Sequence, residues 1–392
     1  MKQTTMLVAA TLLSAMQGLA QNGYQIKGKL KGQGNEKMTL LYRTESERTK
    51  YDSAIAKRNS FVMKSDVAME PVVGFLNTKI DRNLRFSDNP NAPYSPAPSL
   101  EVVLSSQTNI KVTGTAAEIH LATIKGDPMN NDLNRLHEAE KAVFTKLWEL
   151  QKASAKARRE KTNTKESDAK LGQEMTAARA ERTAIRKQFV KDNPGSFISV
   201  YLLATMSTDY KNNELAQAFK NLTDDYRKTM YGKMVAAKIE AGNATALGKF
   251  APDFTKPDVN GKPVSLSSLK GKYVLVDFWG SWCGPCRRSH PHLKEAYAKY
   301  KSKGFEILGI ACERKSPDEA IAAWKQAMDE DRIDWMQVIN DVGIKEQDVT
   351  QLYGIEGFPT KLLLDKDGKI IAKWLGLESK ELDAKLKEIF GE

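Results

Sequence analysis

The amino-acid sequence predicts a multidomain protein in which an N-terminal antiparallel β-domain and a helical hairpin region precede a C-terminal α/β domain. Two observations support this fold class. The apolar pattern changes from short alternating segments to a helical period and then to strands alternating with helices. The length of 392 residues also exceeds that of one ordinary domain. We expect domains at residues 21–115, 116–247 and 248–392, after a signal peptide at residues 1–20.

The region before about residue 115 is predicted to form short strands. Turn-forming clusters such as Gly32-Gln33-Gly34 separate segments in which apolar and polar residues alternate. The expected strands are Tyr24–Leu30, Met38–Tyr42, Phe61–Lys64, Leu100–Leu104 and Asn109–Val112. No histidine cluster or glycine-rich phosphate loop in this β-rich domain points to catalysis.

The next region has the apolar period of α-helices. One apolar stripe runs from Leu136 to Leu150 and a second from Leu171 to Phe189, with the polar stretch Lys161–Ser167 between them. This pattern predicts an antiparallel helical hairpin, whose second helix ends before Pro194 because proline cannot continue a helix. Further helices are expected at Ser196–Met206, Asn213–Asn221 and Asp224–Glu240, followed by a linker at 241–247.

From Phe250 onward strands and helices alternate, which is typical of a largely parallel sheet flanked by helices. The expected strands are Tyr273–Trp279, Phe305–Ala311 and Trp335–Ile339, with a final antiparallel hairpin of Thr360–Asp365 and Lys369–Trp374. The expected helices are Pro285–Lys303, Pro317–Glu330, Glu346–Tyr353 and Ser379–Phe390.

The first twenty residues have the pattern of a secretory signal peptide. Lys2 supplies a weakly positive start, Met6–Met16 an apolar stretch, and Gly18-Leu19-Ala20 a small-residue cleavage site. The apolar stretch is shorter than the roughly 20 residues that span a bilayer, and no later segment is apolar enough to do so. We therefore expect a periplasmic protein, cleaved after about Ala20, that does not span the membrane.

The net charge of +11 does not indicate a nucleic-acid partner, because the basic excess lies outside the α/β domain. Residues 250–392 carry 22 Lys and Arg against 23 Asp and Glu, so the excess lies upstream. There it falls on polar helices, whose charged faces are expected to be solvated rather than to bind phosphates.

Two cysteines, Cys283 and Cys286, carry the chemistry that the sequence predicts. Their C-x-x-C pattern stands where an apolar strand is followed by a helix, so the first thiol lies near the positive end of the helix dipole, which stabilises a thiolate. The second thiol lies one turn on, close enough to resolve a mixed disulfide. We expect a redox-active disulfide that needs no cofactor.

Half of a zinc site is the alternative interpretation of these cysteines. It would need a second pair of ligands, but Cys312 is the single further cysteine, and His120 and His137 lie far upstream. We therefore expect no metal.

Several motifs of the C-terminal domain resemble those of the thioredoxin superfamily. The strand Val274–Trp279 leads into the C-x-x-C pattern, Pro291 follows it, and Gly357–Thr360 lies downstream. Further motifs are Ala251–Phe254, Gly261-Lys262 and Leu269–Lys272. They narrow the resemblance to exported TlpA/ResA-like thiol–disulfide oxidoreductases, which implies a thioredoxin-like fold for residues 248–392. The upstream half is more loosely similar to a domain of unknown function that precedes many Bacteroidetes thioredoxin-like proteins.

This resemblance implies roles for individual residues. Cys283 matches the nucleophile and Cys286 the buried resolving thiol. Asp277 matches a buried carboxylate that takes a proton from Cys286 and returns it, because burial favours the neutral acid; simple satisfaction by backbone donors is the alternative. Pro359 matches a cis-proline facing the disulfide, where the strand edge beside Phe358 can pair with an extended substrate.

The residues around the cysteines include one departure from the family. Trp282 is expected to flank the disulfide, whereas Trp279 either flanks it or packs in the core. TlpA/ResA-like proteins often carry a glutamate three residues after the second cysteine, where this chain has Ser289. A serine cannot shuttle protons, so a role of this position in tuning the thiols is in doubt.

Three nearby side chains are expected to be bystanders. His290 and His292 are assigned to a solvated helix face, because a C-x-x-C pair needs no histidine. Cys312 ends the apolar strand at Phe305–Ala311, and we expect it to be a buried small hydrophobe that stays reduced rather than a regulatory thiol.

The resemblance also implies partners, namely protein thiol and disulfide substrates, a membrane electron donor and a link to cytochrome c maturation. Two alternatives stay open. A peroxiredoxin-like peroxidase would need a threonine three residues before the reactive cysteine, where this chain has Gly280. The β-rich and helical regions could also form an envelope binding module, to which the redox domain is accessory.

Overall fold

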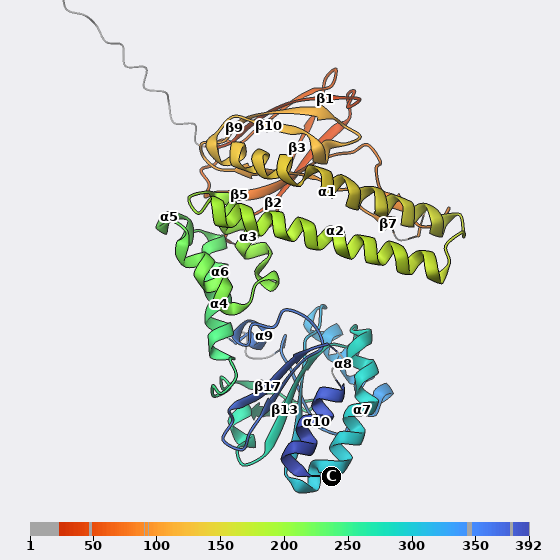
Figure 1. Cartoon of the computed structure of the whole chain (residues 1–392), viewed down its shortest axis with the longest axis vertical. Helices are drawn as coiled ribbons and strands as arrows, with labels where there is room; N and C mark the ends of the chain where they lie inside the picture. The colour runs from red at the N-terminus through yellow and green to blue at the C-terminus, as the bar shows by residue number, and fades with distance from the viewer. Residues whose placement is uncertain are drawn as a thin grey trace, which may run out of the picture. The chain divides into compact units, whose positions relative to one another are not determined.

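The computed structural model describes residues 23–46, 49–89, 91–92, 94–342, 347–376 and 379–391 (Figure 1). The expected signal peptide and its cleavage site after Ala20 lie outside these residues. The chain divides into two compact units, Met1–Tyr201 and Leu202–Glu392. The first holds the β-rich region and a helical hairpin, and the second holds shorter helices and the α/β domain.

The first unit contains two four-stranded sheets, with strand orders β10-β9-β1-β4 and β3-β2-β5-β8. Their strands are β1 (Gln25–Lys31), β2 (Lys37–Arg43), β3 (Thr49–Ile55), β4 (Ser60–Lys64), β5 (Val72–Thr78), β8 (Leu100–Leu104), β9 (Asn109–Thr115) and β10 (Thr123–Lys125). A separate short pair consists of β6 (Leu84–Arg85) and β7 (Tyr94–Ser95). Every second residue of β1 is buried, which is the period of a strand with one face on a core.

One strand pair differs from the expected antiparallel arrangement. β1 and β9 run parallel, with Gln25 opposite Asn109. A parallel pair needs a long crossover, and the chain between these strands supplies it while forming the second sheet. The five expected strands are present, whereas the sequence pattern misses β3, β5, β6, β7 and β10.

A helical hairpin follows the strands in the first unit, as the two apolar stripes predict. Its helices are α1 (Pro128–Arg159) and α2 (Lys165–Asp192). The side chains of Asp127 and Thr164 cap their N-termini by accepting hydrogen bonds from backbone amides. Val143 of α1 packs with Ala178 of α2 in the seam between them.

Shorter helices follow at α3 (Phe197–Thr205), α4 (Asn212–Asn221), α5 (Asp224–Arg227) and α6 (Met230–Ala244). The single helix expected at Asp224–Glu240 is therefore wrong. Thr229 starts α6, and its side chain accepts a hydrogen bond from the Gly232 amide at 3.3 Å. A Cβ at position 232 would lie 2.2 Å from the carbonyl oxygen of Arg227, so the turn between α5 and α6 requires glycine there.

The second unit is built on a five-stranded sheet with the order β15-β14-β13-β16-β17. Its strands are β13 (Tyr273–Trp279), β14 (Phe305–Ala311), β15 (Met336–Ile339), β16 (Thr360–Leu364) and β17 (Ile370–Leu375). β13, β14 and β15 run parallel, whereas β16 and β17 form the expected antiparallel hairpin. A small pair, β11 (Thr255–Pro257) and β12 (Pro263–Ser265), comes before them in the chain.

Helices flank this sheet, and Figure 1 shows α7 and α10 along one side of it. The helices are α7 (Gly284–Tyr300), α8 (Pro317–Asp331), α9 (Val349–Leu352) and α10 (Ser379–Phe390). The first residue of the expected helix Glu346–Tyr353 lies outside the described residues.

Alternate residues of β13 point to opposite faces of the sheet. Leu275 packs with residues of α7 and α10, whereas Val276 and Phe278 pack with Tyr353 on the other face. Asp277, two residues after Leu275, therefore belongs to the face that α7 covers.

Candidate active site

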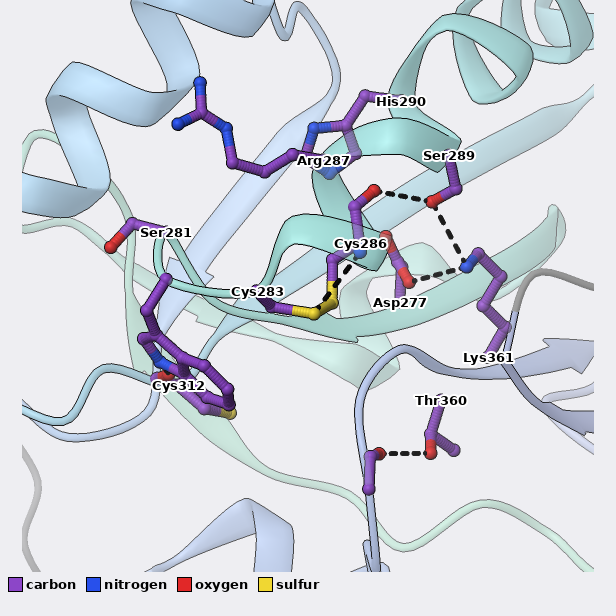
Figure 2. The surroundings of a disulfide bond; sticks show 12 residues. Asp277, Ser281, Cys283, Cys286, Arg287, Ser289, His290, Cys312, Thr360 and Lys361 are labelled. Atoms are coloured by element: carbon purple, nitrogen blue, oxygen red, sulfur yellow. Dashed lines mark hydrogen bonds and ion pairs between the residues drawn. A yellow bond between two sulfur atoms is a disulfide. The ribbon is translucent and has the colours of Figure 1, made fainter. Parts of the chain in front are cut away.

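The two cysteines lie where β13 ends and α7 begins. They form a disulfide bond, with Cys283 at the N-cap of α7 (Figure 2). The amide of Cys286 donates a hydrogen bond to Sγ of Cys283 at 3.3 Å. In the reduced protein this amide and the helix dipole would stabilise a thiolate on Cys283.

Both cysteines are enclosed in the disulfide form. The exposed fraction is 4% for Cys283 and zero for Cys286, so Cys283 is the more accessible of the two. The pair packs with Trp279, which is fully buried and whose indole Nε1 donates to Oε1 of Gln337 at 2.9 Å. Trp279 is therefore a core residue that also packs around the disulfide.

Trp282 forms an exposed aromatic wall beside the cysteines. Its side chain is held in place because Nε1 donates to the carbonyl oxygen of Cys312 at 2.9 Å. Its ring lies edge-on to that of Phe358, with centroids 5.5 Å apart, and the guanidinium of Arg314 lies 3.5 Å from its centroid. The structure thus brings two of the three predicted substrate-binding residues into contact.

The third predicted substrate-binding residue, Pro359, lies between Phe358 and the start of β16. The peptide bond between Phe358 and Pro359 is cis, as the resemblance implied. The carbonyl oxygen of Pro359 accepts a hydrogen bond from the Gly376 amide at 2.9 Å, which joins this segment to the residue after β17.

Asp277 has a buried basic partner that the sequence analysis missed. It lies opposite Lys361 in the ladder between β13 and β16. Nζ of Lys361 is 3.5 Å from Oδ1 of Asp277, and the side chains are only 7% and 1% exposed (Figure 2). The sequence offered one signal for this pair, namely a lysine within an otherwise apolar strand. The register that places this lysine opposite Asp277 is not readable from the sequence.

Ser289, which replaces the family's glutamate, completes this polar cluster. Its hydroxyl donates to the carbonyl oxygen of Cys286 at 2.7 Å, and Nζ of Lys361 lies 3.4 Å from the same hydroxyl oxygen. The side chains of Asp277, Lys361 and Ser289 thus form a chain of contacts that reaches the backbone of Cys286 (Figure 2).

The expected solvated position of His290 is wrong. The residue is 1% exposed, its ring lies 4.9 Å from that of Trp279, and its Nδ1 is 2.7 Å from Oδ2 of Asp331. Burial lowers its pKa, although the charges of Asp277 and Asp331 oppose that shift. The helical period of the sequence could have predicted this burial, because positions 286, 290, 293 and 297 share the buried face of α7.

His292, by contrast, is on the outer part of α7. Its side chain is 25% exposed and Nε2 lies 2.8 Å from Oδ1 of Asp383. Neither histidine contacts a sulfur through any hydrogen bond of the described residues.

Cys312 is a buried free thiol, as expected from the sequence. It packs with Phe278 and Val338 on the face of the sheet away from α7, whereas the disulfide packs with Trp279 and Ala311. Burial raises the pKa of the Cys312 thiol, and nearby carboxylates raise it further. The thiol is therefore protonated and unreactive at neutral pH.

A peroxiredoxin would need a threonine at position 280, but the structure has no room for a side chain there. A Cβ on Gly280 would lie 2.6 Å from Nε1 of Trp282 and 2.7 Å from the carbonyl oxygen of Cys312. The peroxidase interpretation therefore conflicts with the packing of Trp282.

Neither a membrane-spanning helix nor a cluster of metal ligands is found in the part of the chain that the structure describes. No helix there combines the length and the apolar character needed to cross a bilayer. No group of three or more His, Cys, Asp or Glu side chains in these ranges is placed to hold a metal ion.

Known protein families match both the N-terminal β-rich region and the C-terminal α/β domain of this chain. The Redoxin family model matches residues 246–388, and the model of a domain of unknown function, DUF4369, matches residues 24–133. The thiol–disulfide oxidoreductase ResA of Bacillus anthracis is 38% identical over 144 residues, which are 36% of this chain and 78% of ResA. ResA of Bacillus subtilis is 31% identical over 143 residues, covering 36% and 73%.

Among solved structures, the thioredoxin domain of a thiol–disulfide oxidoreductase from Bacteroides vulgatus is 39% identical. It covers 37% of this chain and 98% of its own, with a TM-score of 0.33. The sequence identity to ResA over most of that protein, together with the Cys283–Cys286 disulfide at the start of α7, settles the family. This chain belongs to the ResA-like thiol–disulfide oxidoreductases.

Proposed function

We propose that the protein acts in the periplasm, where Cys283 exchanges electrons with disulfides of other proteins. The observation that carries this proposal is the Cys283–Cys286 disulfide at the start of α7, with the first cysteine the more accessible and the second enclosed. The signal-like pattern of residues 1–20 supports export.

The reaction has two steps. The Cys283 thiolate attacks one sulfur of a substrate disulfide and bonds to it, and the other substrate sulfur leaves as a thiolate that takes a proton from solvent. Cys286 then gives its proton to Asp277, and the new thiolate attacks Sγ of Cys283. The 283–286 disulfide forms, the bound substrate sulfur leaves, and two electrons have passed to the substrate. The reverse sequence oxidises a substrate dithiol.

The substrate is an extended segment of another protein. Its backbone pairs with the chain beside Phe358 and Pro359, in the manner of an added strand. Trp282 provides the facing aromatic wall and is fixed by its contacts with Phe358 and Cys312. Backbone pairing is independent of side-chain identity, so the site would accept several protein substrates.

Each reduction leaves the protein oxidised, so a further cycle needs an electron donor. For a periplasmic protein we propose a membrane-bound donor, which would reduce the 283–286 disulfide by the same two steps in reverse. The resemblance to TlpA/ResA-like proteins also supports a role in cytochrome c maturation.

Trapping of mixed disulfides tests this function. Cys286→Ser should accumulate covalent adducts with periplasmic proteins, because the first step proceeds and the second cannot. Cys283→Ser is the matched control and should form none. Adducts of equal yield in both variants, or in neither, would contradict the proposed roles of the two cysteines.

A further inference from the structure

The first unit contains a cavity of about 230 Å³ that the redox chemistry does not use. Its walls come from β5 and β8, from the short 3-10 helix Ile119–Leu121, and from α1 and α2. The family description of this region assigns it no function.

A buried histidine with unsatisfied nitrogens lines this cavity. His120 is only 4% exposed, and its ring lies edge-on to Phe144 and Trp148, at 5.5 and 6.0 Å between centroids. Within the described residues neither ring nitrogen has a hydrogen-bond partner. Burial lowers the pKa of His120 to about 4, helped by the charges of Arg82 and Lys152. The neutral ring therefore offers one donor and one acceptor.

A second histidine adds a further unsatisfied nitrogen. Nε2 of His137 lies 3.7 Å from Oε2 of Glu101. Its other ring nitrogen, Nδ1, has no hydrogen-bond partner among the residues that the structure describes. Buried polar atoms without partners are rare in folded proteins, so these three nitrogens call for a hydrogen-bonding partner from outside the chain.

The charged groups of the cavity are already neutralised. Glu140 accepts four hydrogen bonds of 2.7 to 2.9 Å from Arg182 and Arg186. Glu138 pairs with Lys141 at the rim, at 3.5 Å. Glu101 accepts a hydrogen bond from the Tyr201 hydroxyl at 2.8 Å, besides its contact with His137. A charged ligand would find no free counter-charge among the residues that line the cavity.

Apart from Ser99, the remaining lining is aromatic and apolar. Phe75 and Phe144 contribute ring surface, and Leu121 and Pro98 contribute aliphatic surface. The guanidinium of Arg182 lies 4.3 Å from the centroid of the Phe144 ring and fixes that wall. C–H groups of a ligand can pack on these rings while its polar atoms reach the histidines.

We propose that this cavity binds one uncharged sugar ring, as a free monosaccharide or as the end of a glycan. Sugar hydroxyl groups both donate and accept hydrogen bonds, so they can pair with the ring nitrogens of His120 and His137. The C–H faces of a pyranose suit the walls formed by Phe75 and Phe144, and a cavity this small admits a single ring. The proposal is independent of the redox function.

Calorimetric titration of the full-length protein with single sugars tests the proposal. The probes are glucose, galactose, mannose and N-acetylglucosamine, with glucuronate and glucosamine as charged counterparts of similar size. We expect at least one uncharged sugar to bind with a millimolar dissociation constant and to raise the melting temperature. We expect neither charged sugar to bind as tightly.

His120→Phe keeps a ring between Phe144 and Trp148 and removes both unsatisfied nitrogens. We expect this variant to fold at least as stably as the wild type, because the two unpaired nitrogens of His120 are no longer buried. Its sugar affinity should fall about tenfold or more, because one donor and one acceptor to the ligand are lost.

Phe75→Ala is a second variant that does not open the core, since Phe75 is 40% exposed. It should also weaken binding, whereas Tyr94→Ala, which removes a 53% exposed aromatic away from the cavity, should not. The proposal is overturned if no uncharged sugar binds at millimolar concentration, if the charged sugars bind as tightly, or if His120→Phe and Phe75→Ala both bind like the wild type.

Discussion

Nζ of Lys361 lies 3.5 Å from Oδ1 of Asp277, across the ladder between β13 and β16 and beside the resolving cysteine Cys286 (Figure 2). The proposed second step transfers the proton of Cys286 to Asp277. Lys361 is therefore the basic group that lies next to the proton acceptor of that step.

Removing the carboxylate should slow that second step. In Asp277→Asn we expect formation of the mixed disulfide to proceed nearly as in the wild type, because the Cys283 thiolate does not need Asp277. Resolution by Cys286 should slow by roughly a hundredfold, since a positioned base is lost. Stopped-flow fluorescence resolves the two steps, and an unchanged resolution rate would make Asp277 a structural residue.

Removing the ammonium should have a smaller effect on the same step. Lys361→Met keeps a stem of similar length and removes the charged group that faces Asp277. We expect resolution by Cys286 to slow by about tenfold at pH 7, while formation of the mixed disulfide stays near the wild-type rate. Stopped-flow measurement of both steps checks this effect, and Ser289→Ala, which removes the other contact of Lys361, is the matched control. An equal loss in both steps of Lys361→Met would point to packing alone.

Cys312 should stay reduced while the 283–286 disulfide forms. It is 6% exposed, its thiol is protonated at neutral pH, and it packs on the opposite face of the sheet from the disulfide. Maleimide should therefore label it only after unfolding. Mass spectrometry of the oxidised native protein gives the linkages, and a 283–312 or 286–312 disulfide would show that Cys312 takes part in the redox chemistry.

Glu140 should make the first unit sensitive to acid. Burial opposes its ionisation, but hydrogen bonds from Arg186 and Arg182 outweigh it and lower its pKa from 4.5 to about 2. The folded form therefore holds its proton less tightly than the unfolded form. The resulting stability, about 3 kcal/mol, is present above pH 4.5 and is lost as the pH falls toward 2.

Glu140→Gln should remove this contribution. Hydrogen exchange of α1 and α2, compared between variant and wild type at each pH so that intrinsic exchange rates cancel, measures the difference. Protection in the variant should be lower at pH 7, and the gap should narrow at pH 3. A gap of equal size at both values would mean that the ion pairs with Arg182 and Arg186 contribute little.

Local patterns in the sequence were enough to predict the site's chemical centre. The apolar strand before Cys283 and the helix after it place both cysteines at a strand–helix junction, because strand and helix periods are properties of neighbouring residues. The same reasoning predicted that Asp277 is buried, because its neighbours in the strand are apolar. The expected domain limits stay predictions.

Tertiary structure decided which side chains surround these groups. Lys361 meets Asp277 only because two strands more than 80 residues apart pair in one register, and no local pattern encodes a register. The parallel pairing of β1 with β9 has the same origin. His120 and His137 line one cavity because the 3-10 helix Ile119–Leu121 packs against α1. Periodicity determines which face of an element is buried, whereas packing between distant elements determines what that face meets.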